Sequence, residues 1–320
     1  MKFKSGLTGF FYLKRMKKKV LIVIAGPTAV GKTALGIQIA KYFKTEIISA
    51  DSRQFFREMS IGTAKPSAEE LAEVPHHFIN SHSIKDQVSV GSYEKEALKK
   101  LEELFTKHDA VVMVGGSGLY INAVLNGFDE LPAVDPAIRA ELNNRLEKEG
   151  IGSLQEDLLK HDPVYYHEVE INNPQRVIRA LEIYHSTGKP FSSFRTGIKK
   201  ERNFDSILIG LNSEREELYN RINKRVDLMI QEGLLDEVKS LAAYKELNSL
   251  NTVGYSELFK FLDEESSLQE AIEHIKQNTR RFAKRQITWF KKLEGINWFH
   301  PNEEKEIISF IEKEMISKKS

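Results

Sequence analysis

The sequence predicts an α/β fold: a doubly wound parallel sheet that carries a helical insertion and is followed by a helical C-terminal region. Three observations lead to this prediction. Short β-branched apolar runs alternate with helical patterns in the first third of the chain, which is typical of a parallel sheet. Helical patterns without a convincing strand follow from about residue 137 to residue 193. The apolar run FDSILIGLN, Phe204–Asn212, then resumes the strand pattern.

The elements of the sheet are predicted in chain order from their periodicity. KVLIVIAG is an apolar run of strand length that ends in glycine, and residues at a helical spacing follow it. TEIISAD and AVVMVGGSG are the next two strands, separated by a helix with one apolar stripe. The predicted elements are a strand at Lys19–Gly26, a helix from about Thr33 through Leu35, Ile39 and Phe43, a strand at Thr45–Asp51, a helix with Tyr93, Ala97, Leu101 and Phe105 on its stripe, and a strand at Ala110–Gly118.

The chain is predicted to divide into four segments. Residues 1–16 are basic, with a short apolar patch and no cleavage site, so we expect a disordered extension there. We expect the first part of a phosphate-binding core at residues 17–130 and a helical insertion at residues 131–203. Residues 204–320 are expected to complete the core and to form C-terminal helices, one of them with an apolar stripe at Leu218, Ile222, Val226 and Met229.

The composition limits the possible functions. The chain has 47 Lys and Arg against 46 Asp and Glu, a net charge of +1. Global charge therefore neither indicates nor excludes a polyanionic partner, and local clusters decide. The absence of cysteine excludes disulfides, cysteine zinc sites and thiol nucleophiles. No apolar run approaches the ~20 residues of a membrane span, so we expect a cytoplasmic protein without membrane contact.

A phosphate-binding loop is predicted between the first strand and the first helix. GPTAVGKT, Gly26–Thr33, matches the P-loop pattern in the strand-to-helix context that the pattern requires. The glycines let successive N–H groups point inward, and the following helix adds its positive end. Lys32 offers a charge to terminal phosphate oxygens, and Thr33 offers a hydroxyl to Mg²⁺. The predicted core is therefore a P-loop α/β core with a phosphate ligand.

The acidic residue that an ordinary P-loop NTPase places at a strand end is missing from the best candidate strand. AVVMV ends in Gly-Gly-Ser-Gly, and the nearest acidic residue at a strand end is Asp51, in SADS. Strand C-termini gather at the ligand crevice, so Asp51 is expected to face the loop. Its role is either a metal ligand or a general base acting on a nucleophile; capping of the next segment is a third alternative.

A basic helix is predicted near the C-terminus. RRFAKRQITWFKK, Arg280–Lys292, has six basic residues and no acidic one. Arg281, Lys284, Arg285 and Thr288 fall along a related helical face, which suits contacts with RNA phosphates. A solvated amphipathic helix with Phe282, Ile287 and Phe290 buried is the alternative, and the two can hold together.

Seven motifs in a fixed order resemble one family. The chain resembles the tRNA dimethylallyltransferases, also called tRNA isopentenyltransferases, from about Lys19 to Phe299. The motifs are GPTAVGKT, ISADS, IGTAKP (61–66), VPHH (74–77), GGSGLY (115–120), NPQRVIRALE (173–182) and AKRQITWF (283–290).

The resemblance implies a prenyl donor. In this family the loop holds the diphosphate of dimethylallyl diphosphate with Mg²⁺, and the prenyl group moves to the exocyclic amine of adenosine at tRNA position 37, next to the anticodon. The catalytic residues implied are Asp51, Arg225, Lys32 and Thr28. The diphosphate contacts implied are Gly26, Pro27, Thr28, Ala29, Val30, Gly31, Lys32, Thr33 and Arg225, with Thr33 on the metal.

The resemblance also implies a tRNA surface, with the helical insertion holding the anticodon stem-loop. We expect the protein to act as a monomer. The tRNA contacts implied are Asp51, Ser52, Arg53, Gln54, Ser117, Arg139, Gln175, Arg176, Val177, Ile178, Arg179, Asn251, Thr252, Val253, Gly254, Tyr255, Ser256, Lys284, Arg285, Gln286, Trp289 and Lys291.

Two positions depart from the family pattern. Ser117 stands where the family usually has Thr, which keeps the hydroxyl. Arg53 begins the run Arg-Gln-Phe-Phe where the family usually has Met-Gln-Val-Tyr or similar, which places a charge beside Asp51. Either a lower pKa for Asp51 or a contact with RNA phosphate would follow from that charge.

Three other functions remain open at the level of sequence. A small-molecule P-loop kinase would explain the loop, but not the missing strand-end carboxylate or the basic helix. Prenylation of free adenine nucleotides would need neither the insertion nor that helix. An RNA-binding module with a vestigial loop would leave the complete set of Lys32, Thr33 and Asp51 without a purpose.

Overall fold

The computed structural model describes residues 18–318, so the extension predicted at residues 1–16 lies outside the described part. By contact, the chain forms two compact units. One contains residues 18–88, 96–121 and 202–318, and the other contains residues 89–95 and 122–201. No helix of the described residues is long and apolar enough to cross a membrane.

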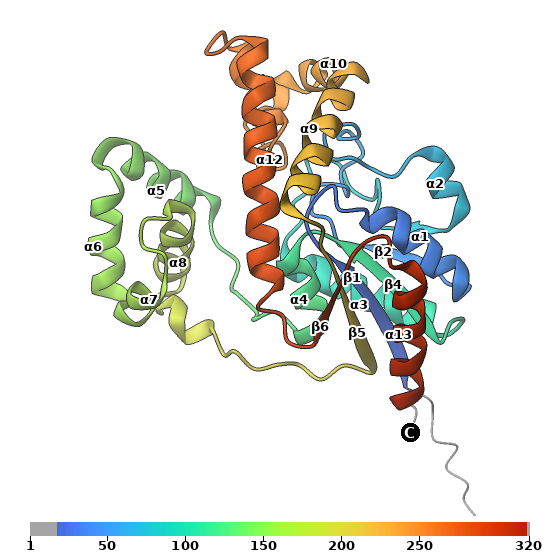
Figure 1. Ribbon diagram of the computed structural model, residues 1–320. Coiled ribbons are helices and arrows are strands. Elements are labelled where there is room, and N and C mark those ends of the chain that lie inside the picture. The colour runs from blue at the N-terminus through green and yellow to red at the C-terminus, as the bar shows by residue number, and fades with distance from the viewer. Residues whose placement is uncertain (1–17, 319–320) are drawn as a thin grey trace, which may run out of the picture. The chain divides into compact units, whose positions relative to one another are not determined.

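The larger unit contains a parallel sheet of six strands (Figure 1). The strand order is β3-β2-β4-β1-β5-β6, and every pairing is parallel. The strands are β1 (Lys19–Ala25), β2 (Ile47–Ser49), β3 (His76–His77), β4 (Ala110–Gly115), β5 (Phe204–Leu211) and β6 (Ile296–Phe299). The chain leaves β1 toward β2 and β3 and later crosses to β5, so the strand order reverses beside β1. Ligands bind at such a switch point in α/β sheets.

Helices and short 3-10 segments make up the rest of both units. They are α1 (Lys32–Tyr42), α2 (Ala68–Glu73), α3 (Val90–Phe105), α4 (Gly118–Asn126), α5 (Pro136–Glu149), α6 (Ile151–His161), α7 (Pro163–Glu168), α8 (Pro174–Thr187), η1 (Phe191–Phe194), α9 (Arg215–Gln231), α10 (Leu234–Ser240), η2 (Ala242–Tyr244), α11 (Tyr255–Leu262), α12 (Leu268–Phe290) and α13 (Glu304–Ser317).

The predicted parallel P-loop α/β fold is confirmed, with two strands more than the sequence predicted. β3 has two residues and β6 has four, and both lie at the edges of the sheet. Segments this short are too short to show the alternation of apolar and polar residues by which a strand is predicted. The predicted stripe of α3 holds at Tyr93, Ala97 and Leu101, but Leu104 rather than Phe105 completes its buried face.

The core of the larger unit explains how the sheet is covered. Side chains of β1, β4 and β5 pack with those of α1, α9, α12 and α13 in one cluster. The stripe predicted at Leu218, Ile222, Val226 and Met229 is buried on α9. A second cluster joins α9 to α10, α11 and the first half of α12. α9 and α12 pack against each other (Figure 1).

The smaller unit contains α5–α8 and η1, and no strand was assigned among its described residues. Prolines at the first helical turn and side-chain caps start three of its helices: Asp135 caps α5, Asp162 caps α7 and Asn173 caps α8. Its core is a separate cluster around Leu142, Leu154 and Leu181.

Candidate active site

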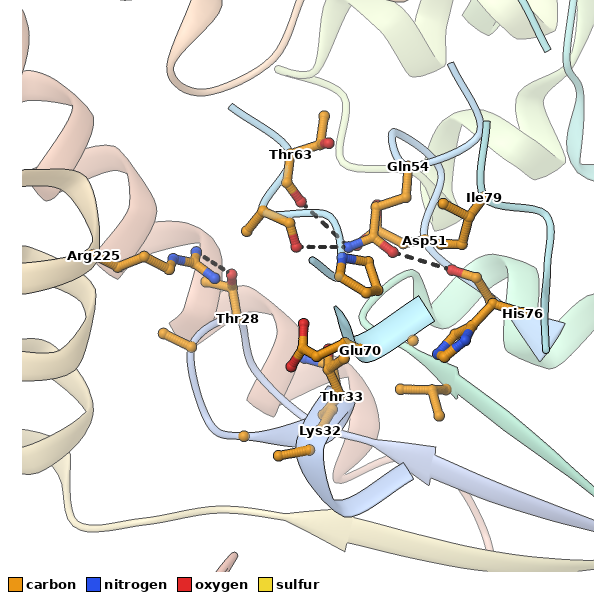
Figure 2. A pocket seen from close by; sticks show the side chains of 18 of the residues that line it. Thr28, Lys32, Thr33, Asp51, Gln54, Thr63, Glu70, His76, Ile79 and Arg225 are labelled. Atoms are coloured by element: carbon orange, nitrogen blue, oxygen red, sulfur yellow. Dashed lines mark hydrogen bonds between the residues drawn. The ribbon is translucent and has the colours of Figure 1, made fainter. Parts of the chain in front are cut away.

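A cavity of about 450 Å³ lies at the carboxyl ends of β1, β2 and β4. Every residue that lines it belongs to the larger unit. The lining side chains come from the loop before α1, the end of β2, the segment between β2 and β3, and α9 (Figure 2). They include Thr28, Lys32, Thr33, Asp51, Gln54, Thr63, Glu70, His76, Arg221, Lys224 and Arg225.

The loop between β1 and α1 has the backbone of an anion-binding nest. Ala29 has φ +64° and Gly31 has φ +107°, left-handed conformations that turn successive N–H groups to one side. A Cβ on Gly26 would lie 2.6 Å from the Leu211 carbonyl oxygen, so only glycine allows the close approach to β5. α1 begins after Gly31 without a side-chain cap. Its first N–H groups therefore lack the usual capping oxygen and suit an anion.

Not every residue of the loop presents its side chain to the cavity. Val30 is fully buried in the hydrophobic core, and Pro27 is buried as well. Any contact of these two residues with a ligand would therefore use main-chain atoms. Thr28, Ala29, Gly31, Lys32 and Thr33 line the cavity.

Two cations meet at the cavity. Lys32 Nζ donates to the Pro27 carbonyl oxygen at 2.7 Å. Burial lowers the pKa of Lys32 to about 8, an effect that the Asp51 carboxylate partly offsets and Arg225 reinforces. Burial likewise lowers the pKa of Arg225 to about 10, again partly offset by Asp51. Both groups are thus desolvated cations, and a bound anion would stabilise their charged forms.

Arg225 reaches the loop from α9 and still has an unused donor. Its Nη2 donates to Thr28 Oγ1 at 2.5 Å, as Figure 2 shows. Its Nε is buried and has no hydrogen-bond partner among the described residues. A buried donor without an acceptor is costly, so Nε is a donor whose hydrogen bond a ligand oxygen could accept.

The cationic face of α9 is wider than the sequence indicated. Arg221 and Lys224 line the cavity together with Arg225. The spacing of 221, 224 and 225 is i, i+3, i+4, which places all three on one side of a helix. That spacing was readable in RINKRV, but only Arg225 was singled out. The three cations outnumber the carboxylates of Asp51 and Glu70 and favour an anionic ligand.

Asp51 faces the cavity and also bonds its own chain. Oδ1 accepts the Arg53 backbone N–H at 3.0 Å, so the capping alternative is realised by one oxygen. The same carboxylate lies near enough to Lys32 and Arg225 to offset part of the lowering of each pKa by burial. Neither use excludes a second contact by the other oxygen, Oδ2.

Residues 60–65 form one side of the cavity and are held in place by hydrogen bonds. No role for this segment was predicted from the sequence. Glu237 accepts the backbone N–H groups of Ser60, Ile61 and Gly62 at 2.8–3.0 Å and the Tyr255 hydroxyl at 2.6 Å. Gln54 Nε2 donates to the carbonyl oxygens of Thr63 and Ala64. Glu70 and His76 complete this side (Figure 2). The motifs IGTAKP and VPHH lie in this region, but no pattern in them predicted that it lines the cavity.

Comparison with known proteins identifies the family. Residues 54–293 match the family described as IPP transferase. A tRNA dimethylallyltransferase of Christiangramia forsetii is 58% identical over 296 residues, which are 92% of this chain and 98% of that protein. The chain belongs to this family.

Other members agree in sequence and in structure. A tRNA dimethylallyltransferase of Flavobacterium johnsoniae is 54% identical and covers 92% of this chain and 97% of its own. The solved tRNA isopentenylpyrophosphate transferase of Bacillus halodurans has a TM-score of 0.70 at 39% identity, covering 94% of this chain and 98% of its own. A eukaryotic dimethylallyltransferase, solved acting on tRNA, has a TM-score of 0.76 at 30% identity over 93% of this chain and 80% of its own.

The glycines of the GGSG turn in this IPP transferase allow neighbouring backbone and side-chain atoms to pack closely against the turn. A Cβ on Gly115 would lie 2.2 Å from the Ala50 carbonyl oxygen, and one on Gly118 would lie 2.2 Å from the Trp289 ring. Ser117 Oγ accepts the Ser52 backbone N–H at 3.0 Å and donates to Ser52 Oγ. The turn therefore joins the end of β4 to the segment after Asp51, and the serine hydroxyl has a structural use.

The basic face of α12 is exposed. Arg281, Lys284, Arg285, Thr288 and Lys291 are all exposed, and no ion pair of Lys284 or Arg285 was found in the part of the chain that the structure describes. The expected burial of Phe282 is wrong, because 39% of its surface is exposed. The buried stripe runs through Ala283, Gln286 and Phe290 instead, so position 282 lies off that face. Phe290 is buried as expected, and Ile287 is half-buried.

The segment 251–256 lies beside Arg53. Arg53 Nη2 donates to the Asn251 carbonyl oxygen at 3.2 Å, and burial lowers the pKa of Arg53. Asn251 is exposed, whereas Tyr255 is fully buried. The tRNA contacts predicted for this segment remain predictions, and its exposed positions suit them better than Tyr255 does.

The predicted tRNA residues of the smaller unit differ in exposure. Gln175 and Arg176 are exposed, and Val177 and Ile178 are fully buried in the unit's core. Arg139 Nε and Arg179 Nη1 both donate to the buried carboxylate of Glu182. These positions stay predictions, but the two buried side chains can contact no ligand directly.

Proposed function

We propose that this protein transfers the dimethylallyl group of dimethylallyl diphosphate to the exocyclic amine of adenosine at position 37 of tRNA, with release of diphosphate. The observation that carries the proposal is the cavity itself. Loop N–H groups, Lys32 and an Arg225 with an unused buried donor surround a space that Asp51 also faces. The names of the family's relatives supply the prenyl group and the tRNA.

The diphosphate is the leaving group of the proposed reaction. Negative charge grows on it as the bond between carbon and oxygen breaks. Donors that are fixed in a desolvated site stabilise such charge at the place where it develops. Lys32 and Arg225 are desolvated, as the lowering of both pKa values by burial indicates. The loop therefore assists departure of diphosphate, where a kinase would use the same loop to hold a nucleotide.

Asp51 is proposed as the general base. The exocyclic amine of adenine is a poor nucleophile, because its lone pair is delocalised into the ring. A carboxylate that accepts the amine proton as the new carbon–nitrogen bond forms removes the positive charge from the product. Asp51 Oδ1 is held by the Arg53 N–H, which fixes the carboxylate and leaves Oδ2 for that proton.

The residues present fit a Mg²⁺ ion bound with the donor. Mg²⁺ prefers one or two protein oxygens together with phosphate oxygens and water. The Thr33 hydroxyl lines the cavity beside the phosphate loop, and no group of three or more acidic, His or Cys side chains that could hold a metal alone was found among residues 18–318. Bound there, Mg²⁺ would neutralise charge on the diphosphate.

The partner is proposed to be the anticodon stem-loop of tRNA. The target base must leave its stack to reach a cavity of this kind. The exposed cations of α12 suit backbone phosphates, which give affinity without sequence information. We further propose that the protein works as a monomer in the cytoplasm, where tRNA is available.

One assay tests the proposal against its rivals. The protein is incubated with Mg²⁺, dimethylallyl diphosphate labelled in the prenyl group, and unmodified tRNA with adenosines next to the anticodon. Label should move to that tRNA, and not to a matched tRNA in which uridine replaces the adenosine at position 37. Transfer only to free adenine nucleotides would contradict the proposal, as would transfer of the γ-phosphate of ATP without any prenylation.

A further inference from the structure

Gln286 occupies a position on α12 where the helix pattern calls for an apolar residue. The buried stripe of α12 is Ala271, Ile275, Thr279, Ala283, Gln286 and Phe290. Gln286 is only 7% exposed. Burial of an amide costs free energy unless its polar atoms are bonded. Its presence on this stripe therefore needs an explanation in terms of its partners.

Both ends of the Gln286 amide bond main-chain atoms at the cavity. Oε1 accepts the Thr28 backbone N–H at 2.8 Å, and Nε2 donates to the Gly116 carbonyl oxygen at 2.9 Å. A Cβ on Gly116 would lie 2.4 Å from Nε2, so the glycine makes room for this contact. One side chain of α12 thus bridges the phosphate loop and the turn after β4.

Thr28 is consequently held from two helices. Its N–H points to Gln286 of α12, and its hydroxyl accepts from Arg225 of α9 at 2.5 Å. The Thr28 amide is therefore engaged within the protein. Within residues 18–318, no main-chain acceptor was found for the N–H groups of residues 29–33, so these groups, together with Lys32 and Arg225, can serve an anion.

We propose that Gln286 is a positioning residue that holds the phosphate loop at Thr28 in the geometry that binds the diphosphate of the prenyl donor. The inference rests on the proposed function for the identity of the donor. It assigns Gln286 to the donor side, whereas the resemblance placed it among the tRNA contacts together with Lys284 and Arg285.

The first test is direct binding of dimethylallyl diphosphate with Mg²⁺, measured by calorimetry. Gln286→Met keeps the length of the side chain and removes both bonds. The affinity for the donor should fall roughly 10-fold, as expected for lost hydrogen bonds that orient a binding group. The melting temperature should fall by a few degrees only, because the Thr28 N–H and the Gly116 carbonyl oxygen lose a partner while the apolar side chain still suits the buried stripe. The Kd for tRNA and its salt dependence should stay at the wild-type values.

A second variant breaks the bridge from its other end. Gly116→Ala places a methyl group against Nε2, and the same methyl would lie 3.7 Å from Lys32 Nζ, an ordinary contact. Its donor affinity should fall in the same way as that of Gln286→Met. Arg285→Gln, on the exposed face one residue away, is the matched control, and it should weaken tRNA binding and leave donor affinity unchanged.

Hydrogen exchange of the loop gives a readout that needs no ligand. The Thr28 amide should exchange roughly 10-fold faster in Gln286→Met, because its acceptor is gone. Unchanged exchange and unchanged donor affinity in both variants would overturn the inference, as would a loss of tRNA affinity alone. If the wild-type protein fails to bind dimethylallyl diphosphate, the proposed function fails, while loop exchange still decides whether Gln286 positions Thr28.

Discussion

The arginines of the two units use their donors differently. In the larger unit, Arg225 makes one bond to Thr28 and keeps a buried Nε without a partner among the described residues. In the smaller unit, Arg139 and Arg179 share the Glu182 carboxylate, of which 3% is exposed. Arg145 is paired with Asp157 at 2.8 Å. Arg225 therefore keeps a donor for a bound anion, whereas the arginines of the smaller unit are mostly paired with carboxylates of that unit.

The number of arginines on a surface therefore does not measure its affinity for an anionic partner. Arg139 and Arg179 are neutralised within the unit, so each should add less to RNA affinity than a cation without a carboxylate partner. Lys284 and Arg285 on α12 have no carboxylate partner among the described residues. The cavity and α12 should therefore dominate catalysis and affinity, and the paired arginines should matter more for the stability of their own unit.

Asp51→Asn should have the largest effect. The amide keeps an oxygen for the Arg53 N–H but cannot accept the amine proton. Transfer in a single turnover should slow by roughly 100- to 10,000-fold, which is typical for loss of a general base, while donor affinity changes only a few fold. Rapid-quench measurement of prenylated tRNA gives the rate. A variant that reacted at nearly the wild-type rate would leave Asp51 with capping alone.

Lys32→Met should come next. Loss of a charged donor should weaken binding of dimethylallyl diphosphate roughly 10- to 100-fold. The pKa of Lys32 in the free protein is about 8, so its charged form prevails below pH 8. Donor affinity should accordingly fall as the pH rises through about 8.

The matched control for this pH dependence is Lys65→Met. Burial also lowers the pKa of Lys65 to about 8, but Lys65 bonds Phe56 and Asn80 and does not line the cavity. The fall in affinity near pH 8 should disappear in Lys32→Met and persist in Lys65→Met. The opposite pattern would remove Lys32 from the donor site.

Lys284→Gln with Arg285→Gln should lower tRNA affinity by roughly 10-fold at moderate salt, because two phosphate contacts are lost. The slope of log K against log salt should decrease by nearly two. Filter binding over a salt series measures both. A slope equal to that of the wild type would exclude α12 from the phosphate contacts.

Arg139→Gln should have the smallest effect on tRNA affinity and a visible effect on stability. The change leaves the buried Glu182 with one fewer partner. Because 44% of Arg139 is exposed, we expect a loss of about 1–2 kcal/mol in unfolding free energy, below the 3–5 kcal/mol of a fully buried pair.

The double variant Arg139→Gln, Glu182→Gln is the control, since it removes the buried carboxylate that Arg179 alone would otherwise neutralise, and it should recover part of the stability. If Arg139→Gln instead lowers tRNA affinity as much as the α12 variants and leaves stability intact, the contrast between the two kinds of arginine is wrong.

The sequence was sufficient to predict those parts of the fold that have a recognisable local sequence motif. GPTAVGKT predicted the loop between β1 and α1, and four of the six strands were found from apolar runs. Asp51 and Arg225 do line the same cavity as the loop. The loop, the strands and Asp51 were predicted from local patterns, which a single segment of chain contains, whereas Arg225 was implied by the resemblance to the family.

The features of the site that could not be predicted from the sequence depend on contacts between segments that are far apart in the chain. Nothing near Glu237 indicated that it binds the N–H groups of residues 60–62. The resemblance implied that Gln286 contacts tRNA, and no local pattern indicated its bond to Thr28, which spans 258 positions. The burial of Phe282 was predicted wrongly, since residues one position apart lie 100° apart on a helix and the edge of a stripe is poorly defined.

The central claim is that the loop releases a diphosphate as a prenyl group joins RNA. A single-turnover reaction tests it most directly, with excess protein, Mg²⁺, unmodified tRNA and dimethylallyl diphosphate, in which inorganic diphosphate and prenylated tRNA are both quantified over time. The two products should appear together in equal amounts without ATP, and the modified base should be the adenosine next to the anticodon. Diphosphate release without prenylated tRNA, or modification that requires ATP, would exclude this role of the loop.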